Sequence, residues 1–138
     1  MDETRLAAIP LFTGLSPRQR RGLCKQLREI EIQPGERLVD EGELSEQFFV
    51  IEQGRAAVIA GGKHVSDLGP GDFVGEIGLV RHTARTASVI ATAPLRAIVM
   101  DEKAFRRMSR QMPDVRSRLA AAVEARLQRD RLFGLERD

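Results

Sequence analysis

Apolar and polar positions alternate in short runs through the middle of the chain and follow a helical period towards both ends. From Glu29 to about Met100, runs of β-forming residues are separated by glycine, as in EIEIQPGE, RLVDEGE, QFFVIEQG, RAAVIAGG, ASVIATAP and LRAIVMD. Short strands at this close spacing predict an antiparallel sandwich or barrel. The sequence lacks the alternating helices and strands that a parallel, doubly wound sheet requires.

Helical patterns flank this predicted barrel. Ser16 is a candidate N-cap, Pro17 stands at the first helical position, and Leu23 and Leu27 are apolar at helical spacing, which predicts a short helix leading into the first strand. After the barrel, Asp101 can cap a helix that ends at Pro113, and Asp114 can cap the last helix.

The last predicted helix has an apolar stripe and charged remaining faces. The stripe consists of Val115, Leu119, Ala122, Val123 and Leu127, and the other faces carry Arg116, Arg118, Glu124 and Arg129. We interpret the charged faces as solvated, whereas the stripe needs a cover. That cover is the barrel, a twin helix of a second subunit, or a ligand.

The length and composition fit one globular domain over residues 1–138, because 42% of the residues are hydrophobic and 30% are charged. Within it we expect an N-terminal helical segment (1–28), a barrel (29–100) and C-terminal helices (101–134). The longest charge-free stretch, residues 6–17, is too short to cross a membrane. Asp2 and Glu3 stand where a signal peptide would place positive charge, so we expect a cytoplasmic protein without membrane contact.

Charge is unevenly distributed, although the net charge is only +2. Residues 1–30 have six Lys/Arg against three Asp/Glu, residues 31–100 have six against ten, and residues 101–138 have ten against seven. The middle is therefore acidic and both ends are basic. Because the signs are mixed in the basic tail, we expect a solvated helix rather than direct DNA binding.

Several chemistries have no support in the sequence. Cys24 is the single cysteine and suits a small core residue on a helix, and His64 and His82 stand apart without a metal-ligand pattern. The motifs of hydrolases and zinc proteases are missing. We expect no metal site, no cofactor and no enzymatic activity.

The most informative stretch runs from Leu68 to Ala91 and contains Glu76 in an apolar, glycine-rich setting and Arg85 at the start of an apolar strand. Burying either charge alone is costly, so the two either pair with each other or bind a ligand that offers an anion and a hydroxyl. Gly75 and Gly78 favour the ligand, because glycine lets backbone N–H groups surround a phosphate. An arginine adds a charge-assisted contact, and Thr86 can add a hydroxyl.

This stretch resembles the phosphate-binding cassette of the cyclic nucleotide-binding domain family, through Gly75-Glu76-Ile77-Gly78-Leu79, five further residues, and Arg85-Thr86-Ala87-Ser88-Val89. The resemblance extends over roughly residues 8–133 and includes the turn sequences Pro34-Gly35-Glu36 and Gly69-Pro70-Gly71-Asp72, the glycines Gly42 and Gly54, and the spacing from Phe105 to Pro113. It implies a double-stranded β-helix, that is, a jelly-roll-like antiparallel barrel of eight strands, with a short N-terminal helix and two C-terminal helices.

The resemblance also implies a role for each residue of the cassette, which we take as residues 73–89. Glu76 would bind the ribose 2′-hydroxyl, Arg85 the phosphate oxygens, and Arg126 of the last helix would lie near the base. The ligand-binding set is Gly75, Glu76, Ile77, Gly78, Arg85, Thr86, Ala87 and Arg126. Val74 departs from the phenylalanine common in the family, and Thr86 leaves the choice between cAMP and cGMP open.

These features predict a stand-alone sensor or adaptor for a cyclic nucleotide, cAMP or cGMP. Ligand binding would move the C-terminal helix and signal to a partner protein, or to a second copy bound through that helix. Two alternatives remain open. The chain is the regulatory fragment of a larger channel or enzyme, or it is a degenerate barrel with a structural, dimer-forming role.

Overall fold

The computed structural model describes residues 1–43, 47–75 and 87–132, with the backbone alone at 126, 127 and 129–132. The chain forms two compact units. The barrel unit is Arg28–Glu102, and the helical unit combines Met1–Leu27 with Lys103–Asp138.

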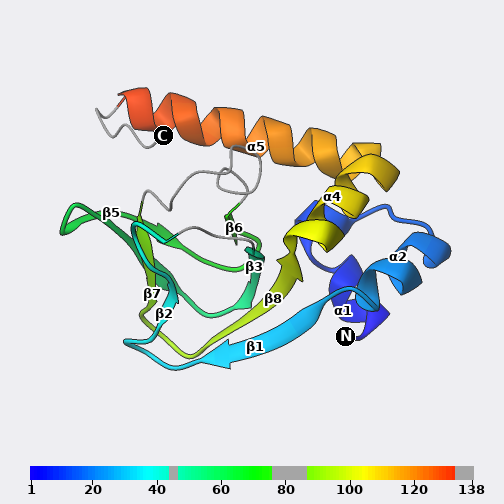
Figure 1. Ribbon diagram of the computed structural model, residues 1–138, viewed down its shortest axis with the longest axis horizontal. Helices are drawn as coiled ribbons and strands as arrows, with labels where there is room; N and C mark the ends of the chain where they lie inside the picture. Colours follow the sequence, from blue (N-terminus) through cyan, green and yellow to red (C-terminus); the bar gives the residue numbers. More distant parts are fainter. Residues whose placement is uncertain (44–46, 76–86, 133–138) are drawn as a thin grey trace. The chain divides into compact units, whose positions relative to one another are not determined.

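The barrel unit consists of two four-stranded antiparallel sheets (Figure 1), with strand orders β1-β8-β3-β6 and β2-β7-β4-β5. The strands are β1 (Arg28–Ile32), β2 (Arg37–Val39), β3 (Gln47–Gln53), β4 (Ala56–Ala60), β5 (Lys63–Leu68), β6 (Phe73–Val74), β7 (Ser88–Ala91) and β8 (Leu95–Asp101). The expected jelly-roll-like antiparallel fold is confirmed. Two of these strands, β5 and β6, were not among the runs that the sequence predicted.

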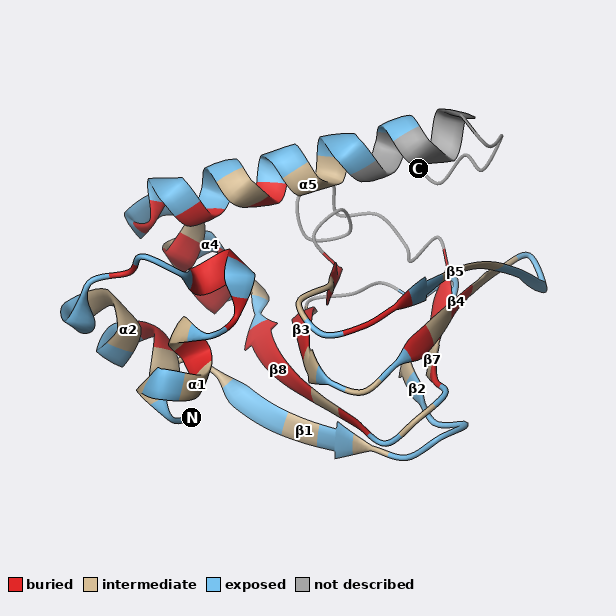
Figure 2. Cartoon of the chain, turned by 180° about the vertical axis from the view of Figure 1, so that it is seen from behind, coloured by how far each residue is buried: buried red, intermediate tan, exposed pale blue. Residues whose placement is uncertain are grey.

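The barrel is held by apolar side chains that face inward from both sheets. β3 and β8 lie inside their sheet and are buried along most of their length, whereas β1 is an exposed edge strand (Figure 2). The core cluster includes Val39, Phe49, Ile51, Ala56, Val58, Leu68, Val74, Ala87, Val89, Ala91, Leu95, Ala97 and Val99. Two of its members, Val74 and Ala87, stand beside the ends of the stretch expected to bind a ligand.

The turn between β3 and β4 requires glycine. Gly54 has φ +97°, and a Cβ atom there would lie 2.7 Å from the Cα of Leu95. Both the backbone conformation and the close approach exclude larger residues.

The helical unit contains α1 (Glu3–Ala7), the 3₁₀ helix η1 (Pro10–Phe12), α2 (Pro17–Cys24), α4 (Glu102–Gln111) and α5 (Pro113–Leu132). The predicted start of α2 is confirmed: the Ser16 hydroxyl accepts the N–H of Gln19, and the Gln19 side chain accepts the N–H of Ser16. This reciprocal capping box satisfies two amides that would otherwise lack partners. α1 was not predicted; the carboxylate of Asp2 caps it.

The C-terminal helices match the prediction with two differences. α5 begins at Pro113, so Asp114 lies in its first turn and is not its cap; proline suits this position because its φ is fixed at a helical value. Arg118 is half-buried rather than solvated, since its Nη1 donates to the carbonyl oxygens of Leu11 (3.0 Å) and Thr13 (2.6 Å). Among the described residues, no helix combines the length and apolar character needed to cross a membrane.

Candidate functional site

The cassette begins at β6, on one edge of the first sheet. β6 pairs with β3 through Phe49–Val74 and Val50–Phe73. The preceding residues form the expected β-turn, in which the N–H of Asp72 donates to the carbonyl of Gly69 (3.0 Å) and the Asp72 carboxylate accepts the N–H of Gly69 (2.8 Å). This turn fixes the direction in which the chain enters the cassette.

Gly75 directly follows β6, is buried, and has φ +105°. A residue with a Cβ is strained in this region of backbone conformation, so the position favours glycine for conformational reasons. Gly75 thus has a left-handed backbone conformation immediately before Glu76 in the sequence.

The far end of the cassette lies in the other sheet. Ala87 is 9% exposed and belongs to the barrel core, and Ser88 opens β7, which pairs with β2 on one side and β4 on the other. The cassette therefore connects an edge strand of one sheet to an inner strand of the other. Both of its ends are anchored by buried residues.

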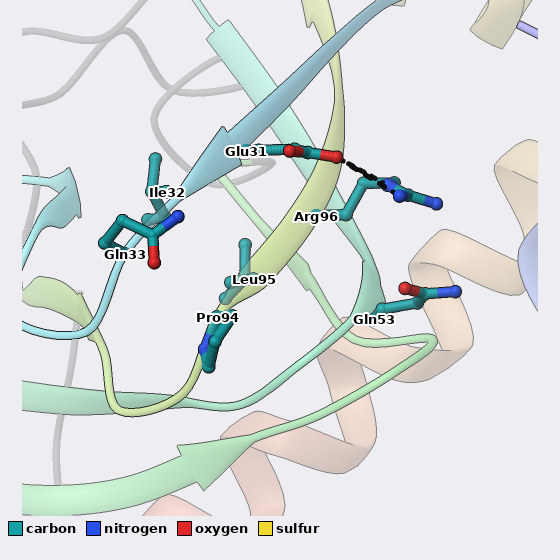
Figure 3. A pocket seen from close by; sticks show the side chains of 7 residues that line it. All are labelled: Glu31, Ile32, Gln33, Gln53, Pro94, Leu95 and Arg96. Carbon is teal, nitrogen blue, oxygen red and sulfur yellow. Dashed lines mark hydrogen bonds and ion pairs between the residues drawn. The ribbon is translucent and has the colours of Figure 1, made fainter.

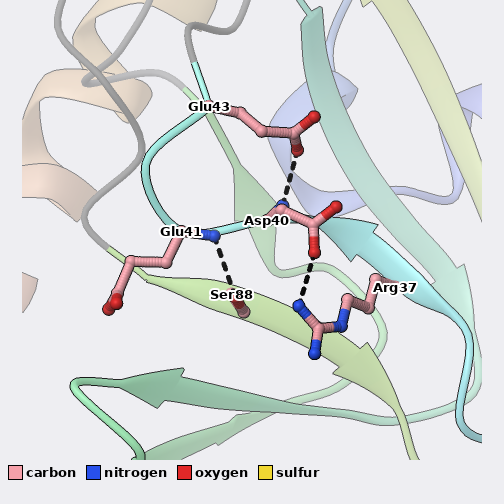
Figure 4. A network of polar contacts seen from close by, with 5 residues as sticks. All are labelled: Arg37, Asp40, Glu41, Glu43 and Ser88. Atoms are coloured by element: carbon pink, nitrogen blue, oxygen red, sulfur yellow. Dashed lines mark hydrogen bonds and ion pairs between the residues drawn. The ribbon is translucent and has the colours of Figure 1, made fainter.

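A carboxylate-rich loop, Asp40–Glu43, lies beside this far end (Figure 4). The N–H of Glu41 donates to the Ser88 hydroxyl (2.8 Å), and Arg37 donates to the Asp40 carboxylate (2.7 Å). The N–H of Asp40 donates to Glu43 Oε1 (2.8 Å). The loop was not predicted from the sequence as part of the site, because its contact with Ser88 joins residues far apart in the chain.

Comparison with known proteins now decides the family. The model of the cyclic nucleotide-binding domain matches residues 29–112, more than half of the chain. The chain belongs to the cyclic nucleotide-binding domain family. The family expected from the cassette motif is therefore confirmed.

Individual relatives support the same assignment. The chain is 31% identical over 136 residues to a cAMP-dependent protein kinase regulatory subunit of Hypocrea atroviridis, covering 99% of this chain and 27% of the relative. It is 37% identical over 126 residues to the acetyltransferase Pat of Mycolicibacterium smegmatis, covering 88% of this chain and 38% of that protein. The chain thus spans well under half of these relatives.

A solved structure extends the likeness to the fold. The cAMP-bound protein PfPKA-R matches with a TM-score of 0.86 and 25% identity, covering 97% of this chain and 46% of that chain. The agreement includes the flanking helices, because it spans nearly the whole chain. Its bound cAMP is a property of that protein.

The predicted ligand-binding residues divide into two groups. Gly75 and Ala87 are placed at the two ends of the cassette. Glu76, Ile77, Gly78, Arg85 and Thr86 lie outside the described residues, and Arg126 lies within α5 without a described side chain. The roles assigned to this second group stay predictions.

A hollow on the barrel lies between the ends of β1, β3 and β8 (Figure 3). It is lined by Glu31, Ile32, Gln33, Gln53, Pro94, Leu95 and Arg96. Its cation, Arg96, donates through Nε (3.2 Å) and Nη2 (3.1 Å) to Glu31 Oε1. The guanidinium is therefore already paired with a carboxylate.

Cys24 is the last residue of α2 and is half-buried, in keeping with the packing role expected for it. Burial raises the pKa of its thiol. The thiol is therefore protonated at neutral pH, which makes it a poor nucleophile.

Proposed function

We propose that this domain binds a cyclic nucleotide, cAMP or cGMP, in the cassette and acts as a sensor. The observation that carries the proposal is the buried Gly75 with φ +105°, directly before the Glu76 and Arg85 motif of a family that binds these ligands. Left-handed residues occur in backbone nests, in which successive N–H groups point toward a bound anion.

The chemistry of the cassette suits a phosphate joined to a sugar. Arg85 supplies a planar guanidinium that can donate two parallel hydrogen bonds to phosphate oxygens. Glu76 can accept the ribose 2′-hydroxyl, and the backbone of Gly75, Ile77 and Thr86 would complete the contacts. None of these roles requires bond making or breaking, so we propose binding without catalysis.

Signalling would follow from a change in helix position. A ligand shifts a conformational equilibrium only as far as it binds one state more tightly than the other. We propose that the ligand draws the C-terminal helix, with Arg126, toward the base, and that a partner protein or a second copy responds to this helix.

A second candidate is the regulatory part of a longer protein. It is favoured by the relatives, which include a kinase regulatory subunit and an acetyltransferase and are two to four times longer than the matched region. Both candidates place the same ligand in the same cassette. A degenerate barrel that lacks a ligand is the alternative that a binding experiment separates from both.

Isothermal titration calorimetry with cAMP and with cGMP tests the proposal. We expect saturable binding of at least one of them and a loss of roughly 30-fold to several thousandfold in affinity for Arg85→Ala, because truncating a desolvated charge pair costs about 2–5 kcal/mol. Arg81→Ala, which removes a cation four residues earlier, is the matched control and should change affinity by less than about threefold.

Two results would overturn the proposal. One is the absence of heat with either nucleotide at high micromolar concentration while circular dichroism shows a folded protein. The other is an Arg85→Ala variant whose affinity stays within the range of the Arg81→Ala control.

A further inference from the structure

Ser88 is the one buried polar residue in the described part of the chain, with 8% of its surface exposed. Its neighbours Ala87, Val89 and Ala91 belong to the barrel core. Because side chains alternate along a strand, Ser88 faces the opposite side of β7. Burying a hydroxyl away from that core is costly unless it is hydrogen-bonded.

The partner of this hydroxyl results from an irregularity between β2 and β7. Arg37 is paired with Ile90 and Val39 with Val89, so two steps along β2 match one step along β7. Beyond Val39 the backbone pairing ends, and the N–H of Glu41 donates to Ser88 Oγ at 2.8 Å. The serine hydroxyl therefore replaces a backbone acceptor and extends the contact between the two segments.

Glu41 makes a second connection. Its Oε1 accepts the N–H of Gly61 at 2.9 Å, in the turn between β4 and β5. One residue thus joins the start of β7 to a neighbouring turn, and the direction of its carboxylate is set by that contact. The other two carboxylates of the loop also have donors close in sequence (Figure 4): Arg37 donates to Asp40, and the N–H of Asp40 donates to Glu43.

The loop therefore carries three carboxylates, each held by a donor of the chain, and its backbone contacts the end of the cassette through the hydrogen bond from the N–H of Glu41 to Ser88. Ser88 follows Arg85 by three residues. Negative charge close to a bound phosphate opposes binding, most strongly where solvent is excluded. A loop that lost its attachment to Ser88 would no longer keep these carboxylates in the orientations that their donors set.

We infer that Ser88 is a positioning residue for the cyclic-nucleotide site, which fixes the strand after Arg85 and keeps the carboxylates of Asp40–Glu43 turned to their own donors. This inference rests on the proposed function. Ser88 acts through the loop and the strand and needs no contact with the ligand.

The affinities of Ser88→Ala and the parent protein for cAMP and cGMP, measured by calorimetry, provide the first test. We expect a loss of about three- to tenfold, the equivalent of one hydrogen bond. Ser88→Thr keeps the hydroxyl and should recover most of the affinity. Ser66→Ala is the matched control, because Ser66 lies half-buried on β5 of the same sheet. The affinity of this variant should stay within about twofold of that of the parent protein.

A double-substitution cycle with Glu41→Gln separates positioning from simple destabilisation. The glutamine amide would keep an oxygen that can accept the Gly61 N–H, but it has no charge. If the released carboxylate weakens binding, the effect of Ser88→Ala should shrink to under about twofold in the Glu41→Gln background. A purely structural defect would lower the melting temperature equally in both backgrounds and would leave the affinity gap unchanged.

The outcomes are distinct. Loss of affinity in Ser88→Ala that Ser88→Thr and Glu41→Gln both relieve supports the inference. A parent that binds, together with Ser88→Ala at unchanged affinity or with an affinity loss that Glu41→Gln does not relieve, overturns the inference and leaves the proposed function intact. A parent that does not bind overturns the proposed function, and the positioning role with it.

Discussion

The barrel unit and the helical unit both bury apolar side chains, but they differ in their backbone pairing and polar contacts. The barrel has two hydrogen-bonded sheets around a continuous apolar cluster. The helical unit combines two segments from opposite ends of the sequence, and Arg118 of α5 joins them by donating to the carbonyl oxygens of Leu11 and Thr13. Their charges also differ: the barrel unit has seven Lys/Arg and thirteen Asp/Glu, and the helical unit has fifteen and seven.

For the proposed sensor function, this difference suggests how the binding site and the responding element are divided between the units. A ligand site requires fixed geometry, which backbone pairing and a packed core provide. The helical unit also buries apolar side chains, but its two segments are in addition joined by the hydrogen bonds of Arg118, which can be exchanged at lower cost than a core. We therefore expect glycine substitutions in the barrel to act through backbone geometry, and substitutions of exposed or half-buried arginines in the helical unit to act through single polar contacts.

The largest effect is expected for Gly54→Ala in the barrel. The new Cβ would lie 2.7 Å from the Cα of Leu95, and the residue would keep φ +97°. Because backbone atoms must move, we expect the free energy of unfolding to fall by about 3 kcal/mol or more, measured by urea denaturation.

Gly62→Ala is the matched control for this substitution. Gly62 also has a positive φ, +77°, but a Cβ atom added there would have no other atom within 4 Å. The conformational cost alone is roughly 1–2 kcal/mol. Equal losses of unfolding free energy in the two variants would contradict the view that the close approach of Gly54 to Leu95 constrains the barrel.

Much of the barrel could be predicted from sequence, and the exceptions have physical reasons. Six strands have apolar runs that identify them. β5 is an edge strand with only Val65 and Leu68 as apolar residues, and β6 has two residues, too few to show a period. The start of α2 was predictable because Ser16 and Gln19 are close in sequence and form a known capping pattern.

The site was predictable only where its residues are contiguous. The cassette motif identifies Gly75 through Ala87 by spacing. The contact between Glu41 and Ser88 joins residues 47 positions apart, and the contact of Arg118 with Leu11 joins residues 107 positions apart. A serine or arginine gives no local signal of such a partner, so Arg118 was interpreted as a solvated helix residue.

In the helical unit, Arg118→Met should have an intermediate effect. Methionine keeps the apolar stem but removes both donors, and hydrogen bonds from charged groups contribute about 1.5–3 kcal/mol. Water can hydrogen-bond in part to the two carbonyls that the Arg118→Met variant leaves free. We therefore expect the free energy of unfolding to fall by about 1.5 kcal/mol. Native-state hydrogen exchange should quicken in α1 and α2 and stay unchanged in β3 and β8.

Arg116→Met provides the comparison within the same helix. Arg116 is exposed and has a single long hydrogen bond, 3.3 Å to the carbonyl of Ser109. The free energy of unfolding of the Arg116→Met variant should fall by less than about 0.5 kcal/mol. If the two variants unfold at the same urea concentration, Arg118 does not connect the two segments of the helical unit.

The smallest effect is expected for a guanidinium contact in the barrel, the ion pair of Arg96 with Glu31. Arg96 and Glu31 pair across β8 and β1, but the side chains are 34% and 66% exposed. A double-substitution cycle with Arg96→Met and Glu31→Gln should give a coupling of about 0.2–1 kcal/mol. This coupling should fall in 1 M salt, where the screening length is about 3 Å. A salt-insensitive coupling as large as the Arg118 effect would mean that guanidinium contacts stabilise both units alike, and the division between backbone geometry and single polar contacts would fail.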